Sequence, residues 1–538
     1  MTLRNYLLLA LLGLALLSLV SAFQSAPGYM DADYYYAGGL QLARGHGFSE
    51  PFLWNYLDNP GGIPHPSHAY WMPLASLLAA LGASLFGPGS WTAGRIGFLL
   101  VGAAVPPLTA ALAWRFTSRR NLALISGLLA IFSAFYLPFL PVTDTFGLYM
   151  LLGGIFFLLL IELYSSSRRL AVPYLAGLLG LTAGLMHLTR ADGVLWLLLA
   201  LIAILFGRQR AQPWRGSLAA SAAALGGYLL VMGPWFVRNY LAFGMPLGPG
   251  GARMLWLKSY DELLIYPASR LSFATWWESG IASILKARLW ALGINLQRTL
   301  AEQGEIFLLP FIALGLWHYR REKTILVVGL GWLLTFAAMT LAFPFAGARG
   351  GFFHSGAAFQ PVWWVLAPVG FDRAVEWTSR NRGWKVERAG LLFRPALVGL
   401  AVLLSAGIFW GRLIGTTAVS TKLAVSSSSN EIWGQESIVY EQIDRYLVSV
   451  GAAQTDIVMT ANPPGFYLAS GNPAIAIPDG DGPTLLEVAW RYGAKYLVME
   501  KVSVPVGLKG LYNHPEASLD PIFMGEVGEV HIYQFMQH

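Results

Sequence analysis

The stretch Met30-Asp31-Ala32-Asp33-Tyr34-Tyr35-Tyr36 follows the first hydrophobic segment of the chain, residues 7–20. It leads into an aromatic segment, rich in His and Pro, that ends at Trp71. Carboxylates near the end of a membrane helix are costly to hold there, and such positions usually serve a function. We therefore interpret Asp31 and Asp33 as candidate active-site acids, and we expect later loops to converge on them.

The composition indicates a membrane protein. Of the 538 residues, 55% are hydrophobic and only 12% are charged, whereas soluble domains carry about a quarter charged residues. The sequence contains no Cys, which excludes disulfides, Cys-ligated metals and thiol catalysis. The net charge of +7 is the expected result of basic cytoplasmic loops, so it does not indicate a nucleic-acid partner.

Hydrophobic segments separated by basic turns predict a polytopic α-helical membrane protein with about eleven transmembrane helices. We place them near residues 7–20, 95–114, 121–141, 146–164, 170–188, 193–207, 217–236, 303–319, 324–343, 357–371 and 395–414. The apolar stretch 69–86 is taken as an interfacial helix instead, because counting it as a span would put the following arginines outside. Residues 7–20 are read as an uncleaved helix, since Ser21-Ala22-Phe23 is a poor cleavage site.

We expect a multi-pass protein of the plasma membrane. In this arrangement the basic turns and the N-terminus lie on the cytoplasmic side. These turns hold Arg115, Arg119, Arg120, Arg168, Arg169, Arg208, Arg210, Arg215, Arg320, Arg321, Lys323 and the cluster from Arg373 to Arg394.

The outer side is expected to carry two large loops and a separate domain. Residues 1–414 form the membrane module, with a first outer loop at about 24–94 and a long outer loop at about 238–301. A Ser-rich linker over 415–430 precedes a small extracytoplasmic α/β domain over 431–538. Helices are predicted near 436–450 and 484–492, and strands at 456–460, 474–478, 496–500 and 530–535.

Asp144 lies in a short outer turn, on the same side as Asp31 and Asp33. It suits a cap of the following helix, and one of the two earlier acids also suits a helix cap. As an alternative, Asp33 and Asp144 are candidate ligands of a divalent cation. Oxygen ligands suit Mg or Mn, and a nearby His would admit Zn.

Other outer turns carry His and Arg. His65 and His68 are flanked by Pro and aromatic residues, which is compatible with a metal ligand, a phosphate contact or a contact to the acceptor. Arg190 either pairs with Asp192 or binds a phosphate headgroup through its planar fork. Arg349 and His354 form a second candidate group between glycines.

The order of these features resembles the GT-C superfamily of glycosyltransferases that use polyprenyl-phosphate sugars, especially the protein O-mannosyltransferase and lipid A aminoarabinose transferase branch. The resemblance rests on Asp31-Ala32-Asp33, the segment from His65 to Trp71, Gly94-Arg95, the turn with Asp144 and the turn around Arg190. The O-mannosyltransferase pattern is Asp-Glu, whereas Asp-x-Asp is similar to the oligosaccharyltransferase branch, in which such acids hold a metal.

This resemblance implies a membrane enzyme that transfers a sugar, with inversion, from a polyprenyl-phosphate donor to an outer hydroxyl of a protein, glycan or lipid. Asp31 or Asp33 would be the general base, and Arg190 and Arg349 would bind the donor phosphate. The expected substrate contacts are Tyr35, His65, His68, Tyr70, Trp71 and His354. Two alternatives remain: a transporter or flippase with an acidic outer site, and a noncatalytic scaffold that displays the outer domain.

Overall fold

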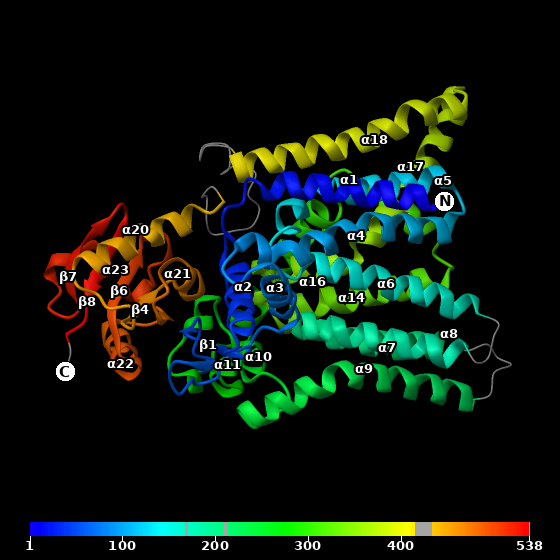
Figure 1. Cartoon of the computed structure of the whole chain (residues 1–538). Coiled ribbons are helices and arrows are strands. Elements are labelled where there is room, and N and C mark those ends of the chain that lie inside the picture. Colours follow the sequence, from blue (N-terminus) through cyan, green and yellow to red (C-terminus); the bar gives the residue numbers. More distant parts are fainter. Residues whose placement is uncertain (167–170, 208–213, 415–432, 537–538) are drawn as a thin grey trace.

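The computed structural model describes residues 1–166, 171–207, 214–414 and 433–536. A bundle of long helices has the N-terminus at one end and a C-terminal α/β region at the other (Figure 1). Arg168, Arg169, Arg208, Arg210 and the predicted linker 415–430 lie outside the described residues.

Each of the expected spans coincides with a helix. Within the described ranges, seven helices are long and apolar enough to cross a membrane: α1 (Leu3–Ser21), α4 (Trp91–Thr117), α6 (Phe146–Ser165), α7 (Ala171–Thr189), α9 (Trp214–Phe243), α14 (Lys323–Ala337, extended to Ala342) and α18 (Val386–Phe409, extended to Ile414). The remaining positions hold α5 (Arg120–Ile131), α8 (Val194–Gly207), α13 (Leu309–His318) and the largely buried α17 (Gln360–Arg382). The predicted class, a polytopic α-helical membrane protein, is confirmed.

Two predicted spans are shorter than expected. Helix α5 ends at Ile131 rather than near residue 141, because Phe132 leaves the helical region and residues Ala134–Phe139 form a short 3-10 helix. Helix α13 begins at Leu309 rather than near 303, because Glu305 and Ile306 have positive φ angles of 44° and 63°. Irregular backbone within a membrane protein is tolerated where it lines a cavity, and Phe135 and Phe139 of the first break do so.

The first outer loop forms a compact layer at the end of the bundle. It contains α2 (Met30–Ala43), a small antiparallel pair of β1 (Ser49–Glu50) and β3 (His65–Pro66), and α3 (Leu74–Phe86). Helix α3 has 13 residues and is roughly 20 Å long, which is too short to cross a bilayer upright. Gly39 allows α2 to approach α3, since a Cβ there would lie 2.6 Å from the Cβ of Ala79.

The C-terminal region is built on a six-stranded sheet to which the first outer loop contributes an edge strand. The strand order is β2-β5-β4-β6-β8-β7, where β2 is Phe52–Leu53, β4 Ile457–Thr460, β5 Ala474–Ala476, β6 Ala494–Glu500, β7 Ile522–Val527 and β8 Val530–Gln534. The sheet is accompanied by α20 (Gln435–Ser449), α21 (Pro463–Ser470), α22 (Gly482–Tyr492) and α23 (Lys509–Asn513). Strands β2 and β7 and helices α21 and α23 were not predicted, whereas the four predicted strands and two predicted helices are present.

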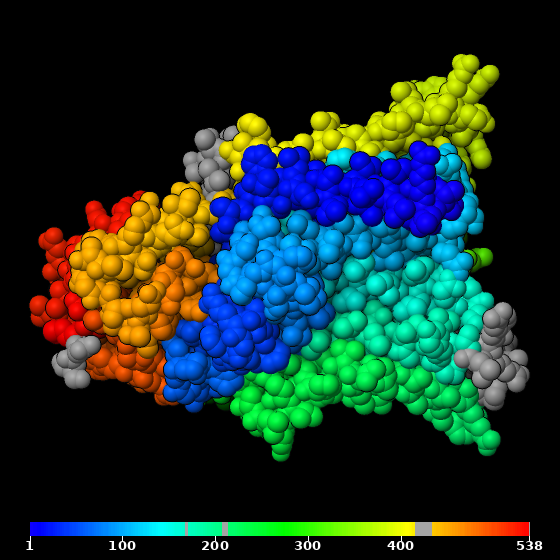
Figure 2. Space-filling view, in the orientation of Figure 1, coloured from blue at the N-terminus to red at the C-terminus, as the bar shows by residue number. Residues whose placement is uncertain are grey.

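The C-terminal region and the first outer loop share one hydrophobic core. Tyr34 and Tyr35 of α2 and Phe52 of β2 pack in the same cluster as Tyr440 of α20 and Phe466 of α21. Figure 2 shows the two regions in continuous contact at this end of the molecule. The long outer loop adds α10 (Pro249–Arg253), α11 (Phe273–Glu278) and α12 (Ile281–Arg298), and two short helices, α15 (Pro344–Ala346) and α16 (Phe352–Gly356), follow α14.

Candidate active site

A cavity of about 1560 Å³ lies where the bundle, the outer loops and the C-terminal region meet. Tyr35, Tyr70 and Trp71 of the first outer loop line it, as do Glu436 and residues 502–506 of the C-terminal region. Pockets for small ligands measure roughly 300–1,000 Å³. This cavity is therefore large enough for two substrates, or for one substrate with a long apolar part.

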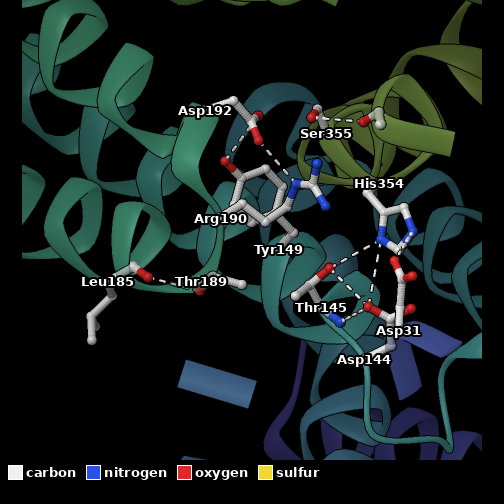
Figure 3. A network of polar contacts seen from close by, with 11 residues as sticks. Asp31, Asp144, Thr145, Tyr149, Leu185, Thr189, Arg190, Asp192, His354 and Ser355 are labelled. Atoms are coloured by element: carbon white, nitrogen blue, oxygen red, sulfur yellow. Dashed lines mark hydrogen bonds and ion pairs between the residues drawn. The ribbon is translucent and has the colours of Figure 1, made fainter. Parts of the chain in front are cut away.

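Three titratable residues from distant parts of the chain meet in the site (Figure 3). Asp31 lies in the first turn of α2, Asp144 in the turn before α6, and His354 in α16. One ligand atom from each lies within 4.8 Å of the other two. His354 Nε2 is 3.7 Å from Asp31 Oδ2, and His354 Nδ1 is 3.5 Å from Asp144 Oδ1.

Asp144 is fully buried and held by several donors. The Tyr29 hydroxyl donates a hydrogen bond to its Oδ2, and the backbone N–H and hydroxyl of Thr145 donate to its Oδ1. Burial raises the pKa of Asp144, while these donors and the charge of Arg190 lower it. The hydrogen bonds therefore offset part of the cost of keeping a buried carboxylate ionised.

Asp31 is the more accessible acid, with a side chain that is 32% exposed, and it lines the cavity. Burial of the carboxyl group, followed by the nearby charge of Asp144, raises its pKa to about 7, although Arg190 acts in the opposite direction. A carboxylate with a pKa near the working pH is suited to accept a proton from a substrate.

The surroundings of His354 favour its neutral imidazole form. Its ring stacks on Phe146 with centroids 3.9 Å apart, and its Nδ1 lies 3.1 Å from the Thr145 hydroxyl oxygen. Burial and the positive charges of Arg190 and Arg298 lower the pKa of His354 well below its usual value. A neutral imidazole has a lone pair that is free to bind a metal ion or to accept a hydrogen bond.

The group Asp31, Asp144 and His354 fits a divalent cation by the chemistry of its donors. Two carboxylates and one neutral imidazole suit Zn or Mn, whereas an imidazole is an unusual ligand for Mg. The expected cation site thus has three candidate ligands, which include Asp31 and His354 in addition to Asp144.

Two arginines expected to bind phosphate line the same cavity. Arg190 Nε donates to Asp192 Oδ1 at 3.0 Å, and its guanidinium lies between Asp192 and His354 (Figure 3). Arg349 lies over the ring of Tyr260, 4.8 Å from its centroid. Arg190 therefore forms the expected ion pair and also presents positive charge close to the acidic cluster.

Asp33 does not join the cation cluster. It is buried, and its Oδ2 accepts a hydrogen bond from Asn462 Nδ2 in the C-terminal region at 2.9 Å. The expected pair of Asp33 and Asp144 is thus replaced by Asp31 and Asp144. The physical reason is the helical period, because residues i and i+2 lie on different faces of a helix.

The two histidines of the first outer loop are buried away from the cavity lining. His65 Nε2 lies 2.6 Å from Asp58 Oδ2. His68 lies between Ser67 and Ser76, at 2.8 and 3.0 Å from their hydroxyl oxygens. Neither side chain is among the residues that line this cavity, so the substrate contacts expected for them stay a prediction.

Several cavity residues were not anticipated. Tyr29 holds Asp144, and Arg412, at the end of α18, has its guanidinium over the ring of Phe139. Arg298 and Glu302 form a buried ion pair on the cavity wall. The only sequence signal for them was the i, i+4 spacing of Arg298 and Glu302; the others depend on contacts between distant segments.

The likeness to known proteins is structural. No model of a protein family matches the sequence, and no curated protein matches it either. ArnT from Cupriavidus metallidurans bound to undecaprenyl phosphate superposes with a TM-score of 0.60 at 11% identity, covering 98% of this chain and 97% of that one. The oligosaccharyltransferase AglB from Archaeoglobus fulgidus, in complex with an inhibitory peptide and a dolichol-phosphate, gives 0.57 at 13% identity, covering 93% and 69%.

A second structure of the Archaeoglobus fulgidus oligosaccharyltransferase, in complex with Zn and sulfate, gives a TM-score of 0.56 at 14% identity over 92% of this chain and 68% of that one. At these identities the likeness establishes the fold. The chain has the GT-C fold, with a helical membrane module and a C-terminal α/β region, as the resemblance in sequence had predicted.

Proposed function

We propose that this protein is a membrane glycosyltransferase that moves a sugar from a polyprenyl-phosphate donor to an acceptor hydroxyl. The observation that carries the proposal is the meeting of Asp31, His354 and Arg190 in one large cavity at the end of the helical bundle, with the buried Asp144 next to Asp31 and His354. The bound lipid phosphates of ArnT and AglB, which share the fold, support a donor of this class.

Arg190 and Arg349 are the proposed contacts for the donor phosphate. A guanidinium binds phosphate through two parallel hydrogen bonds, and both groups reach the cavity. Apolar residues of the same wall, Val194 and Leu195 at the start of α8, would contact the isoprenoid chain. Tyr35, Tyr70 and Trp71 offer aromatic faces for the sugar or the acceptor.

Asp31 is the proposed general base. It takes the proton of the acceptor hydroxyl as that oxygen attacks the anomeric carbon and forms the new C–O bond. The bond between the anomeric carbon and the phosphate oxygen breaks, and the lipid phosphate leaves with the bonding electrons. Because attack and departure occur on opposite faces of the sugar, the anomeric configuration inverts.

A divalent cation held by Asp31, Asp144 and His354 would neutralise negative charge on the leaving phosphate. A carboxylate has two oxygens, so Asp31 can contact a cation through one and accept the proton through the other. His354 would supply the nitrogen ligand, and the hydrogen bonds from Tyr29 and Thr145 would fix the orientation of Asp144.

We further propose that the cavity opens on the outer side of the plasma membrane and that the N-terminus is cytoplasmic. Basic residues such as Arg119, Arg320 and Arg373 lie at turns assigned to the inner side. The N-terminus and the C-terminal region lie at opposite ends of the bundle (Figure 1). The C-terminal region and the long outer loop would then shape the acceptor site, whose occupant is a protein, glycan or lipid.

The test is a transfer assay on the purified full-length protein with a panel of polyprenyl-phosphate sugars. Asp31→Asn should lower transfer by roughly 10²- to 10⁴-fold, the usual contribution of a general base. The matched control is Glu487→Gln, which removes an exposed acid on α22 outside the cavity. Unchanged transfer by Asp31→Asn would refute the assignment of the base, and movement of the lipid across vesicles without sugar transfer would favour the flippase alternative.

A further inference from the structure

Asp31 and Asp33 are two residues apart on α2 but belong to different surroundings. Asp31 faces the cavity, whereas Asp33 is buried against the C-terminal region with 6% of its surface exposed. Residues i and i+2 of a helix lie on different faces. One turn of α2 therefore connects the proposed base to the C-terminal region.

The partner of Asp33 is Asn462, which is itself 3% exposed and begins helix α21. Its Oδ1 accepts a hydrogen bond from the Gly465 N–H at 3.1 Å, which caps the helix. Because the oxygen is used for the cap, the amide NH₂ group must face the other way. It donates to Asp33 Oδ2 at 2.9 Å and to Glu436 Oε1 at 3.0 Å.

Helices α2 and α21 pack so closely at Gly465 that this position has no room for a side chain. A Cβ at Gly465 would lie 2.5 Å from Asn462 Nδ2 and 2.9 Å from Asp33 Oδ2. Real Cβ atoms do not come this close to their neighbours, so Gly465 is required for the contact between Asn462 and Asp33.

A second group of contacts holds the start of α2 at Tyr29. Tyr29, the residue before the helix, donates its hydroxyl proton to Asp144, and its ring packs on Trp433 of the C-terminal region. Trp433 Nε1 in turn donates to the carbonyl oxygen of Ala26 at 3.1 Å. Tyr29 and Asp33 thus fix both ends of the short segment that carries Asp31.

We propose that Asn462 is a positioning residue for Asp31, which it holds in place through Asp33 and the first turn of α2. This inference rests on the proposed function, since it assigns a role within the same transfer reaction. The C-terminal region then completes the active site from outside the membrane module, and Asp33 serves as the anchor and not as the base.

The decisive experiment uses the full-length protein with variants that leave helix α21 able to form but disturb the bridge, which is the pair of hydrogen bonds from Asn462 Nδ2 to Asp33 and Glu436. Asn462→Ser keeps a favoured capping side chain but loses the amide that bridges Asp33 and Glu436. Gly465→Ala crowds the same contact, although Ala favours a helix more than Gly does. Gly482→Ala is the matched control, because a Cβ at this glycine of α22 has open space around it.

For both bridge variants we expect kcat to fall roughly 10- to 100-fold, the cost of a small misplacement of a reacting group. The donor KM should stay within about twofold, because Arg190 and Arg349 are unchanged. Hydrogen exchange of the Asp33 amide, which donates to the carbonyl oxygen of Tyr29, should become faster. Gly482→Ala should match the wild-type protein in all three measurements.

The exchanged pair Asp33→Asn with Asn462→Asp provides a rescue test. It restores an amide-to-carboxylate hydrogen bond with the same total charge, so we expect it to recover part of the kcat lost in Asn462→Asp alone. A rescue would be impossible if Asp33 were the base, since the exchanged protein has no carboxylate at position 33.

Wild-type kcat and unchanged exchange of the Asp33 amide in Asn462→Ser would overturn the inference, even if Asp31→Asn abolishes transfer. If the wild-type protein transfers no sugar from any donor, the proposed function fails instead. The exchange measurements would then still show whether Asn462 orders the first turn of α2.

Discussion

The carboxylate of Asp31 and the imidazole of His354 lie 3.7 Å apart, measured from Oδ2 to Nε2. Asp31 belongs to the first outer loop, and His354 belongs to a short helix that follows α14. These two groups meet only because segments far apart in the sequence pack together. The proposed reaction centre is therefore a product of tertiary structure, with ligands that come from well-separated loops.

The raised pKa of Asp31 predicts the pH dependence of transfer. The pKa of Asp31 is about 7, so its carboxyl group is mostly ionised above pH 7. Only the ionised form can accept a proton. At one pH unit below the pKa, roughly a tenth of the molecules have an ionised base. We expect kcat/KM to rise with pH and to level off above about pH 7, measured on protein treated with a chelator.

A bound cation would favour the ionised form of Asp31 and move this midpoint to a lower pH. Comparing profiles with and without added Mn or Zn therefore links the base to the cation site. A profile that is flat from pH 5 to 8 in both conditions would contradict the assignment of Asp31.

Loss of the imidazole of His354 should lower the affinity of the site for its cation. We expect His354→Ala to reduce cation affinity by about 10- to 100-fold or more, measured by titration calorimetry. His354→Gln retains a polar side chain of similar size and serves as the comparison. Equal binding of Zn by the wild-type protein and His354→Ala would show that the three residues do not form a metal site.

Arg190 should contribute mainly to binding of the lipid phosphate. A charged hydrogen bond contributes about 1.5–3 kcal/mol, so Arg190→Ala should raise the donor KM by roughly 10- to 100-fold. Arg190→Lys keeps the charge but loses the planar fork and should recover only part of the affinity.

Asp192→Asn distinguishes the two roles of Arg190. It removes the ion pair at 3.0 Å and leaves the guanidinium in the cavity. If Asp192→Asn weakens donor binding as strongly as Arg190→Ala does, the ion pair and not a phosphate contact would explain the requirement for Arg190.

The pair of His65 and Asp58 should affect stability and not transfer. The two side chains are mostly buried and lie 2.6 Å apart, and a buried polar group without its partner costs about 1–3 kcal/mol. We expect His65→Leu to lower the thermal unfolding temperature while the kcat of the folded protein stays close to wild type.

The double variant His65→Leu with Asp58→Leu should recover part of this stability, because no polar group is then left unpaired. A large loss of kcat in folded His65→Leu would indicate instead that the histidine contacts the substrate.

Local sequence was sufficient to locate the membrane helices and the main elements of the C-terminal region. Backbone groups inside a membrane must be satisfied within the segment itself, so a long apolar run is enough to specify a helix. The Asp-Ala-Asp stretch, the turn with Asp144 and the Gly-flanked segment around His354 were also recognised as candidate sites from their residues alone.

Only the tertiary structure separated the surroundings of Asp31 and Asp33. The helical period turns them to different faces, but which face meets the cavity depends on the packing of α2 against α3 and α21. The two residues of β2 are too short to show strand periodicity, so their place beside β5 was not predictable. Long-range packing also decided that His354, and not His65 or His68, joins the acids, because a sequence pattern carries no information on which distant loops touch.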